Sequence, residues 1–75
     1  MKNYRLSVVI EKDVEGYFTF CPELQGCYTQ GDSYEEALGN IKDAIRIHLA
    51  DRIKDGEAIP MMESISLTSL EVAVP

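Results

Sequence analysis

The chain has 75 residues, of which 45% are hydrophobic and 27% are charged, a composition that predicts one globular domain over residues 1–75 and excludes a disordered chain. Thirteen acidic residues against seven scattered basic ones give a net charge of −6, which argues against direct binding of RNA or DNA and suits a basic protein partner. No apolar stretch approaches the roughly 18 residues of a membrane span, and the early charges of the N-terminus do not fit a secretory signal, so we expect a cytoplasmic protein.

Three strands are predicted in the N-terminal half. In YRLSVVIE, residues 4–11, the even positions carry the apolar residues Tyr, Leu, Val and Ile, whereas the odd positions carry Arg, Ser, Val and Glu. This alternation is typical of a half-buried strand. The second strand is GYFTFC, residues 16–21, between a turn-like KDVEG and Pro22, and the third covers residues 27–30. Because the connections are short, we predict an antiparallel three-stranded meander.

A long helix is predicted after the third strand. Ser33 and Glu36 form a capping-box pattern, in which each side chain can satisfy a free backbone N–H group of the first turn. Apolar residues then recur at spacings of three and four along one stripe: Ala37, Leu38, Ile41, Ala44, Ile45, Leu49 and Ile53. Lys54, Gly56 and Pro60 are the matching stop signals.

A final strand is predicted over Leu70, Val72 and Val74, which alternate with Glu71 and Ala73. Strand character at positions 65 and 67, both aliphatic, is a weaker alternative. The predicted order β-β-β-α-β is an α+β fold with one helix on one face of the sheet. Since so small a domain buries only about 60% of its surface, self-association is also expected.

The two cysteines, Cys21 and Cys27, are interpreted as small buried hydrophobic residues. A structural zinc site needs four ligands, and two cysteines with one histidine do not supply them. A redox pair is more often C-x-x-C, and a disulfide across so short a loop would contribute only about 2 kcal/mol. We therefore predict no metal, no cofactor and no disulfide.

No catalytic constellation is visible, so we predict that the chain is not an enzyme. The single histidine, His48, falls in mid-helix near the edge of the apolar stripe and is interpreted as a packing or surface residue. Glu11, Asp13 and Glu15 gather around the first turn, where charged residues are usually just solvated. The sequence contains neither a phosphate-binding glycine loop nor a carboxylate cluster with metal-ligand spacing.

The run EGYFTFCPELQGCYTQGDSYEEAL, with YRLSVVIEKD before it and IKDAIRIHLADRIKDGEAIP after it, resembles the HicB family of antitoxin domains over residues 4–60. In that family an acidic turn and a glycine precede an aromatic residue, then Pro-acid-Leu-x-Gly-Cys, then Gly-Asp-Ser/Thr-x-x-Glu-Ala. The matching positions here are Gly16, Tyr17, Pro22, Glu23, Leu24, Gly26, Cys27, Gly31, Asp32, Ser33, Glu36 and Ala37. We expect these positions to act structurally in hairpin, turn or cap, with positive φ at Gly26 and Gly31.

The resemblance implies a partial ribonuclease-H-like fold without ribonuclease activity. It also implies a partner, the HicA toxin, a small basic mRNA interferase whose catalytic surface the antitoxin covers. Full-length members commonly continue into a C-terminal DNA-binding domain, whereas this sequence stops at Pro75, so direct binding of operator DNA is not expected. The alternative is an orphan HicB-like module that self-associates and regulates without a toxin; an Mg²⁺-dependent nuclease is disfavoured.

The sequence does not decide which face of the second strand contacts the helix. Hydrophobicity alone favours Phe18 and Phe20 inward, whereas the resemblance favours positions 17, 19 and 21. In the second register an apolar surface faces away from the helix, formed by Val9, Phe18, Phe20 and Tyr28. We expect a second copy to cover it in a homodimer or higher even oligomer, joined by pairing of the final strand, with the toxin docking nearby against Glu23.

Overall fold

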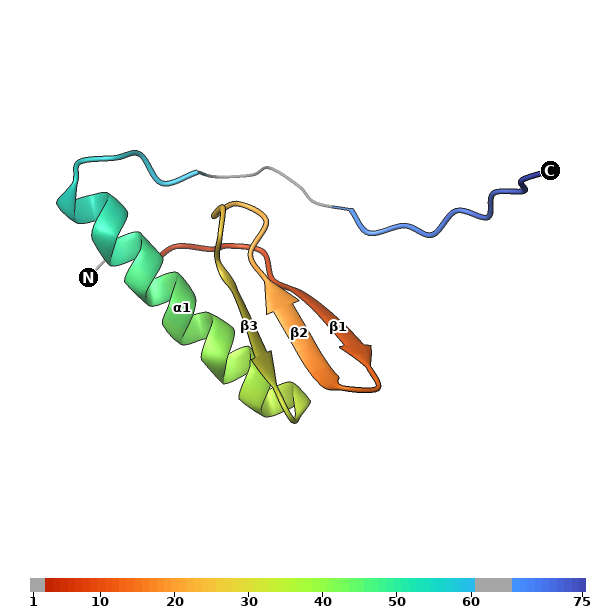
Figure 1. The fold of residues 1–75 in the computed structure, drawn as a ribbon. Helices are drawn as coiled ribbons and strands as arrows, with labels where there is room; N and C mark the ends of the chain where they lie inside the picture. The colour runs from red at the N-terminus through yellow and green to blue at the C-terminus, as the bar shows by residue number, and fades with distance from the viewer. Residues whose placement is uncertain (1–2, 61–65) are drawn as a thin grey trace.

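The computed structural model describes residues 3–60 and 66–75. Its strands and helix are β1 (Val9–Asp13), β2 (Gly16–Phe20), β3 (Tyr28–Gly31) and α1 (Tyr34–Lys54). The strands form one antiparallel sheet in the order β1-β2-β3, and α1 lies across one face of it (Figure 1). The predicted α+β architecture, a three-stranded meander followed by one long helix, is confirmed for the described residues.

The first strand is shorter than its sequence pattern. The pattern covered residues 4–11, whereas β1 begins at Val9, which pairs with Phe20, the last residue of β2. Because β2 ends there, residues 4–8 have no strand beside them. No backbone hydrogen bond joins these five positions to another segment of the described chain.

Helix α1 begins and ends where the capping signals predict. The Ser33 hydroxyl oxygen accepts a hydrogen bond of 3.1 Å from the Glu36 amide, which satisfies one free N–H group of the first turn. At the other end, the Glu57 amide donates to the Arg52 carbonyl at 2.8 Å across Gly56, whose φ is 72°. This bond is that of a Schellman motif, whose left-handed residue is most easily a glycine.

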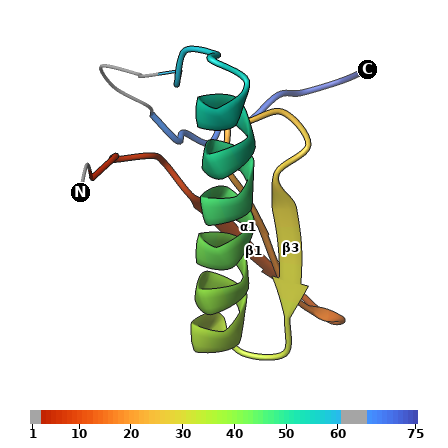
Figure 2. The same cartoon turned by 90° about the vertical axis from the view of Figure 1, so that its left-hand side faces the viewer.

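The hydrophobic core lies between α1 and the inner face of the sheet, and no helix of the described residues covers the other face (Figure 2). Its fully buried members are Thr19, Cys21, Leu24, Cys27, Ala37 and Ile41. The buried Thr19 hydroxyl is satisfied, because it lies 2.6 Å from the hydroxyl of Thr29 on the next strand. So small a core leaves the stability of the single chain marginal.

The final strand predicted over residues 70–74 is absent from the described structure. Residues 66–75 form no strand and run away from the sheet and helix (Figure 1). The radius of gyration is 14.8 Å, against about 11 Å for a compact chain of this length. An apolar alternating segment needs a neighbouring strand, and none of the strands in the described chain lies beside this one. Of the weaker alternative, Leu67 is exposed and Ile65 lies outside the described residues.

Candidate functional site

The residues of the second predicted register lie together on the open face of the sheet. Val9 stands opposite Phe20, and Phe20 stands opposite Tyr28. The Phe18 ring stacks on the Tyr28 ring with centroids 6.0 Å apart, and it lies 6.4 Å from the Phe20 ring. We call these four residues the aromatic patch. The register favoured by hydrophobicity alone is wrong, since Thr19 and Cys21 face the helix.

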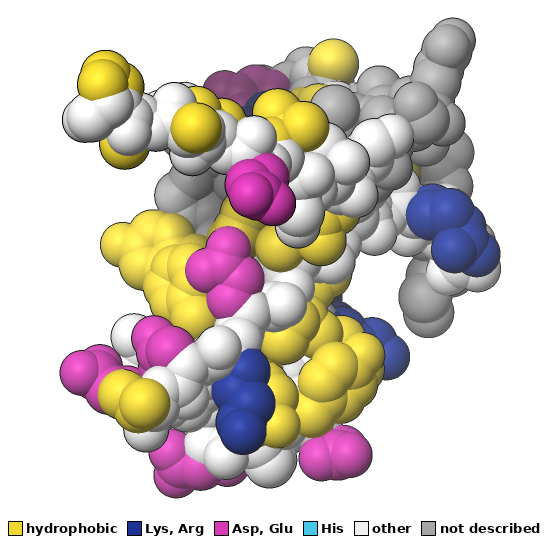
Figure 3. All heavy atoms as spheres, turned by 90° about the vertical axis from the view of Figure 1, so that its right-hand side faces the viewer, with side chains coloured by type: hydrophobic (Ala, Val, Ile, Leu, Met, Phe, Trp, Pro, Cys, Tyr) yellow, Lys and Arg dark blue, Asp and Glu magenta, His cyan; other side chains and the backbone are white. Residues whose placement is uncertain are grey.

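Acidic side chains lie beside the aromatic patch. Glu11 is opposite Phe18 on the same face, a neighbour that the sequence analysis did not include in the patch. Asp13 ends β1 and Glu15 follows in the turn to β2, where the Asp13 carboxylate accepts a hydrogen bond of 2.8 Å from the Glu15 amide. Seen from the right-hand side of Figure 1, exposed hydrophobic side chains lie among acidic ones, and a basic side chain lies among them as well (Figure 3). The open face therefore combines apolar surface with negative charge.

Glu23 has an internal role that the sequence did not reveal. Its two carboxylate oxygens accept hydrogen bonds of 3.1 and 3.0 Å from the Ser7 amide. One of them also lies 3.7 Å from the Cys21 thiol. These contacts hold the chain before β1 against the loop after β2. Glu23 was predicted as part of a partner surface, and its contacts in the structure are with this chain.

Both cysteines lie in the core, as interpreted from the sequence. Cys21 and Cys27 are free thiols, and each is 2% exposed. The backbone amide of Cys21 donates a hydrogen bond of 3.0 Å to the backbone carbonyl of Cys27. Burial raises the pKa of the Cys21 thiol to about 11, and it raises the pKa of Cys27 as well. Thiols of high pKa are poor nucleophiles and poor metal ligands at neutral pH.

The loop between the cysteines is closed by its own backbone. The Leu24 amide donates to the Cys21 carbonyl and the Cys27 amide to the Leu24 carbonyl, both at 3.1 Å. Leu24 is 1% exposed and fills the end of the core, while Pro22 lies at the surface. In this structure the motif residues of the loop therefore act in turn and packing.

Glycines close the two turns of the meander. Gly16 has φ 133° and starts β2, and a Cβ there would lie 3.0 Å from the Gly31 carbonyl oxygen. Gly26 has φ 80°, as expected. Gly31 does not have positive φ, so that expectation was wrong. A Cβ at Gly31 would instead lie 2.5 Å from the Ala37 amide nitrogen, which makes close approach of β3 to α1 the reason for this glycine.

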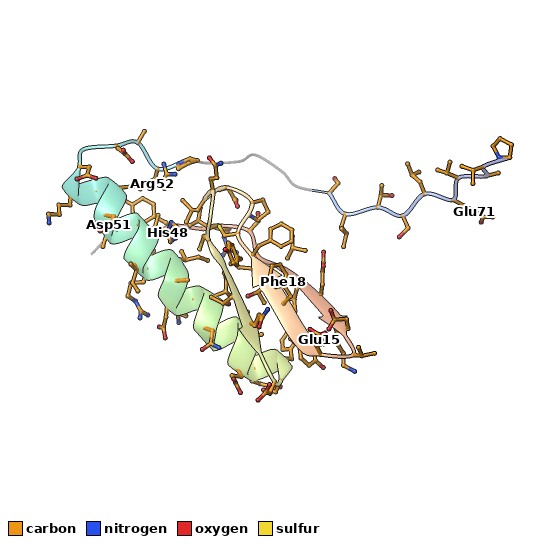
Figure 4. All side chains as sticks on the ribbon, viewed as in Figure 1. Glu15, Phe18, His48, Asp51, Arg52 and Glu71 are labelled. Atoms are coloured by element: carbon orange, nitrogen blue, oxygen red, sulfur yellow. The ribbon has the colours of Figure 1, made fainter. Side chains whose placement is uncertain are left out.

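His48 lies far along α1 from the aromatic patch. The labelled side chains show His48 with Asp51 and Arg52 near the end of the helix, whereas Phe18 and Glu15 lie on the sheet and its turn (Figure 4). Among the described residues, no group of three or more His, Cys, Asp or Glu side chains could hold a metal ion. Nor is any helix in the described part of the chain long and apolar enough to cross a membrane.

Comparison with known proteins identifies relatives over most of the chain. The sequence model of a family described as "HicB_like antitoxin of bacterial toxin-antitoxin system" matches residues 6–72. A UPF0150 protein of Helicobacter pylori is 47% identical over 68 residues, which are 91% of this chain and 94% of that protein. Antitoxin HicB 1 of Photorhabdus laumondii is 39% identical over 62 residues, which are 81% of this chain but 40% of that antitoxin.

A solved structure is similar as well. A chain in a structure titled "HicA3 and HicB3 toxin-antitoxin complex" matches with a TM-score of 0.59 and 25% sequence identity. The match covers 75% of this chain and 65% of that one.

An open apolar face beside acidic side chains, on a domain too small to bury it, is typical of a small domain that binds another protein. The chain belongs to the family of HicB-like antitoxins of bacterial toxin–antitoxin systems.

Proposed function

We propose that this chain is an antitoxin that binds and neutralises a small, basic, RNA-cleaving toxin of the HicA type. The observation that carries the proposal is the family match over residues 6–72. The likeness to a chain of a HicA3–HicB3 complex supports a toxin of that kind as the partner. Neutralisation then requires no catalytic group in this chain, because covering the toxin's catalytic surface is enough to keep RNA out.

The aromatic patch is the surface that we assign to the toxin. A second copy of the chain on this patch, as expected from the sequence, stays a prediction. A second copy would bring the same net charge of −6 and the same Glu11 beside Phe18. With a basic partner, the same charges would instead raise the rate of association and favour that partner over others. Charge complementarity therefore favours the toxin over a second copy at this face.

Direct action on nucleic acid is not part of the proposed function. The acidic chain lacks the clustered Lys and Arg side chains that neutralise phosphates, so it should neither retard duplex DNA nor cleave RNA. Any effect on RNA should come through the toxin. We place this action in the cytoplasm, where messenger RNA is found. We also propose that the sheet is part of a partial ribonuclease-H-like fold.

The test is a titration of toxin activity. A small, basic, His-containing protein encoded in the adjacent reading frame would be purified and its RNA cleavage measured against increasing amounts of this chain. Cleavage should fall linearly to zero near equimolar antitoxin. Cleavage that is unchanged by excess antitoxin contradicts the proposal, as does Mg²⁺-dependent cleavage by this chain alone that a carboxylate variant abolishes.

Variants of the aromatic patch locate the surface. Phe18→Ser/Phe20→Ser should lose most of the inhibition while keeping its helical circular dichroism, because both rings lie on the open face. The matched control is Ile47→Ser, which removes an exposed apolar side chain from α1 at 63% exposure. The control should inhibit as the wild type does. A double variant that unfolds would place the rings in the core instead.

The second candidate function is an orphan module without a toxin. It is favoured by relatives of similar length, since 94% of the Helicobacter pylori protein and 94% of a Thermoplasma acidophilum relative are covered by their matches to this chain. An adjacent frame that encodes no small basic protein, together with a chain that associates only with itself, would support this function over the first.

A further inference from the structure

Two segments of the chain have strand patterns and no partner strand. Residues 4–8 precede β1 and extend past the end of β2, so they lack a neighbour on the sheet. Residues 70–74 carry the second pattern and likewise form no strand. The two segments have the same length, about 17 Å when extended. Each segment therefore lacks the strand with which its pattern would let it pair.

The first segment forms one wall of an apolar groove. The groove has a volume of about 370 Å³ and lies between residues 4–8 and α1. Its lining residues are Tyr4, Leu6, Val8, Leu38, Ile41, Lys42 and Ile45. Leu38 belongs to the apolar stripe of α1 and lines this groove, yet it is 42% exposed. The groove is the part of the core that the described chain leaves open.

The second segment presents matching side chains to solvent. Leu70, Val72 and Val74 are 84%, 75% and 83% exposed. In an extended chain they share one side, with Glu71 and Ala73 on the other. Residues 66–75 run away from the sheet and helix (Figures 1 and 2). Glu71 accordingly projects from this outlying part of the chain (Figure 4).

We propose that residues 70–74 of one copy pair with residues 4–8 of a second copy and place Leu70, Val72 and Val74 in its groove. The direction of the segment, away from its own groove, indicates a second copy as the recipient. By two-fold symmetry each chain gives one strand and receives one, so both grooves are filled. The proposal concerns this chain alone and does not depend on the toxin.

Backbone hydrogen bonding on the receiving segment suits an added strand. The Ser7 amide is already bound by the Glu23 carboxylate on the side of the β2–β3 loop. In an extended chain successive amides point to opposite sides, so the amides of Leu6 and Val8 point to the free edge. An edge with unpaired donors and acceptors is a template for a strand from another chain.

Charge and side-chain size select a parallel register. With Glu71 beside Arg5, parallel pairing puts Leu70 beside Tyr4 and Val72 beside Leu6, and it brings the last valine of the segment beside Val8. Antiparallel pairing with the same ion pair puts the polar Thr68 there instead. Parallel pairing therefore buries all three apolar side chains of the exchanged segment.

Sedimentation of the purified chain tests the exchange. The wild type should sediment as a dimer or a higher even oligomer, and Val72→Asp should sediment as a monomer with unchanged helical circular dichroism. The matched control is Ala73→Asp, which adds the same charge one residue later on the outward side and should keep the oligomer. A monomeric wild type, an oligomeric Val72→Asp variant or equal loss in both variants overturns the proposal.

A second pair of variants tests the groove from the helix side. Leu38→Asp places a charge in the groove, whereas Ile47→Asp makes the same kind of change on α1 at a side chain that does not line it. The first should dissociate the oligomer and the second should not. Dissociation by both, or by neither, contradicts the assignment of the groove as the receiving site.

Cysteine cross-linking distinguishes the register and the source of the strand. Ser7→Cys/Ala73→Cys should form disulfides between chains under mild oxidation, since parallel pairing sets these positions side by side. Ser7→Cys/Ser69→Cys, which antiparallel pairing would join, should form few. Disulfides within one chain would show that the segment folds back on itself, and preferential cross-linking through position 69 would overturn the parallel register.

These outcomes separate this inference from the proposed function. A chain that dimerises but inhibits no toxin leaves the exchange intact, and a monomer that inhibits leaves the antitoxin role intact.

Discussion

At the scale of single residues, a glycine marks the closest approach of helix and sheet. A Cβ at Gly31 would lie 2.5 Å from the amide nitrogen and 2.8 Å from the Cα of Ala37. Both are backbone atoms, so the clash can be relieved only by moving α1 or β3. Gly39, by contrast, lies on the outer side of α1, and a Cβ there would meet no atom within 4 Å.

Gly31→Ala should therefore destabilise the fold by roughly 1–3 kcal/mol, the usual cost of forcing extra atoms into a packed site. Gly39→Ala should stabilise it by about 0.5–1 kcal/mol, because alanine is the better helix former. Urea unfolding followed by circular dichroism measures both. Equal stability of the two variants would mean that the close contact between β3 and α1 is absent.

The thiol of Cys21 should make stability depend on pH in the alkaline range. Burial, assisted by the nearby Glu23 carboxylate, raises the pKa of Cys21 from 9.0 to about 11. Above pH 9 the unfolded chain releases this proton while the folded chain retains it, so the free energy of unfolding falls as the pH rises from 9 toward 11. Below pH 9 this contribution is constant.

The measurement is the urea midpoint at several pH values between neutral and pH 10.5 for the wild type and Cys21→Ala. Other groups also titrate there, so the informative quantity is the difference between the two slopes. The variant should lose less stability with rising pH. Parallel curves would show that the thiol is accessible to water.

What the sequence predicts at this scale depends on how far apart the interacting residues are. The Ser33 cap was predictable, because its donor is the amide of Glu36 three positions later. The role of Glu23 was not, because its partner Ser7 lies sixteen positions earlier and belongs to an irregular segment. A local pattern carries no information about such a contact.

At the scale of elements, close packing of the helix explains why hydrophobicity gave the wrong face of β2. The inner face carries Thr19 and Cys21, and Gly31 of β3, which is opposite Tyr17, leaves space for Ala37 of the helix. Rings of the size of Phe18 would hold α1 farther from the sheet. The larger side chains therefore lie on the open face, and the choice between the two registers follows from volume more than from hydrophobicity.

The start of α1 should be sensitive to loss of its cap. Ser33→Ala removes the hydroxyl that accepts the Glu36 amide and should cost about 1 kcal/mol. Ser69→Ala, in the exposed segment after the helix, should leave the stability within about 0.5 kcal/mol of the wild type. Chemical unfolding of the two variants compares them, and a silent Ser33→Ala would show that the helix does not depend on this bond.

At the scale of the whole molecule, the sequence predicted every element that finds its neighbours within the chain. The three strands and the helix follow from alternation, turn residues and caps, all of which are local. The segment 70–74 has the same kind of pattern, and the structure leaves it unpaired. We attribute this difference to a partner strand that belongs to a second copy of the chain.

The exposed segment has a consequence for the lifetime of the protein. Proteases cut extended, accessible backbone far faster than helices or paired strands, and residues 66–75 offer such backbone in a single copy. A chain freed by dilution should therefore be cleaved first in this segment, while chains whose segments are paired should resist. Limited proteolysis at a series of protein concentrations, read by mass spectrometry, should show cleavage within 66–75 slowing as the concentration rises. A cut chain could no longer give its strand to another copy, so in this protein dissociation would lead to degradation and degradation would prevent reassembly.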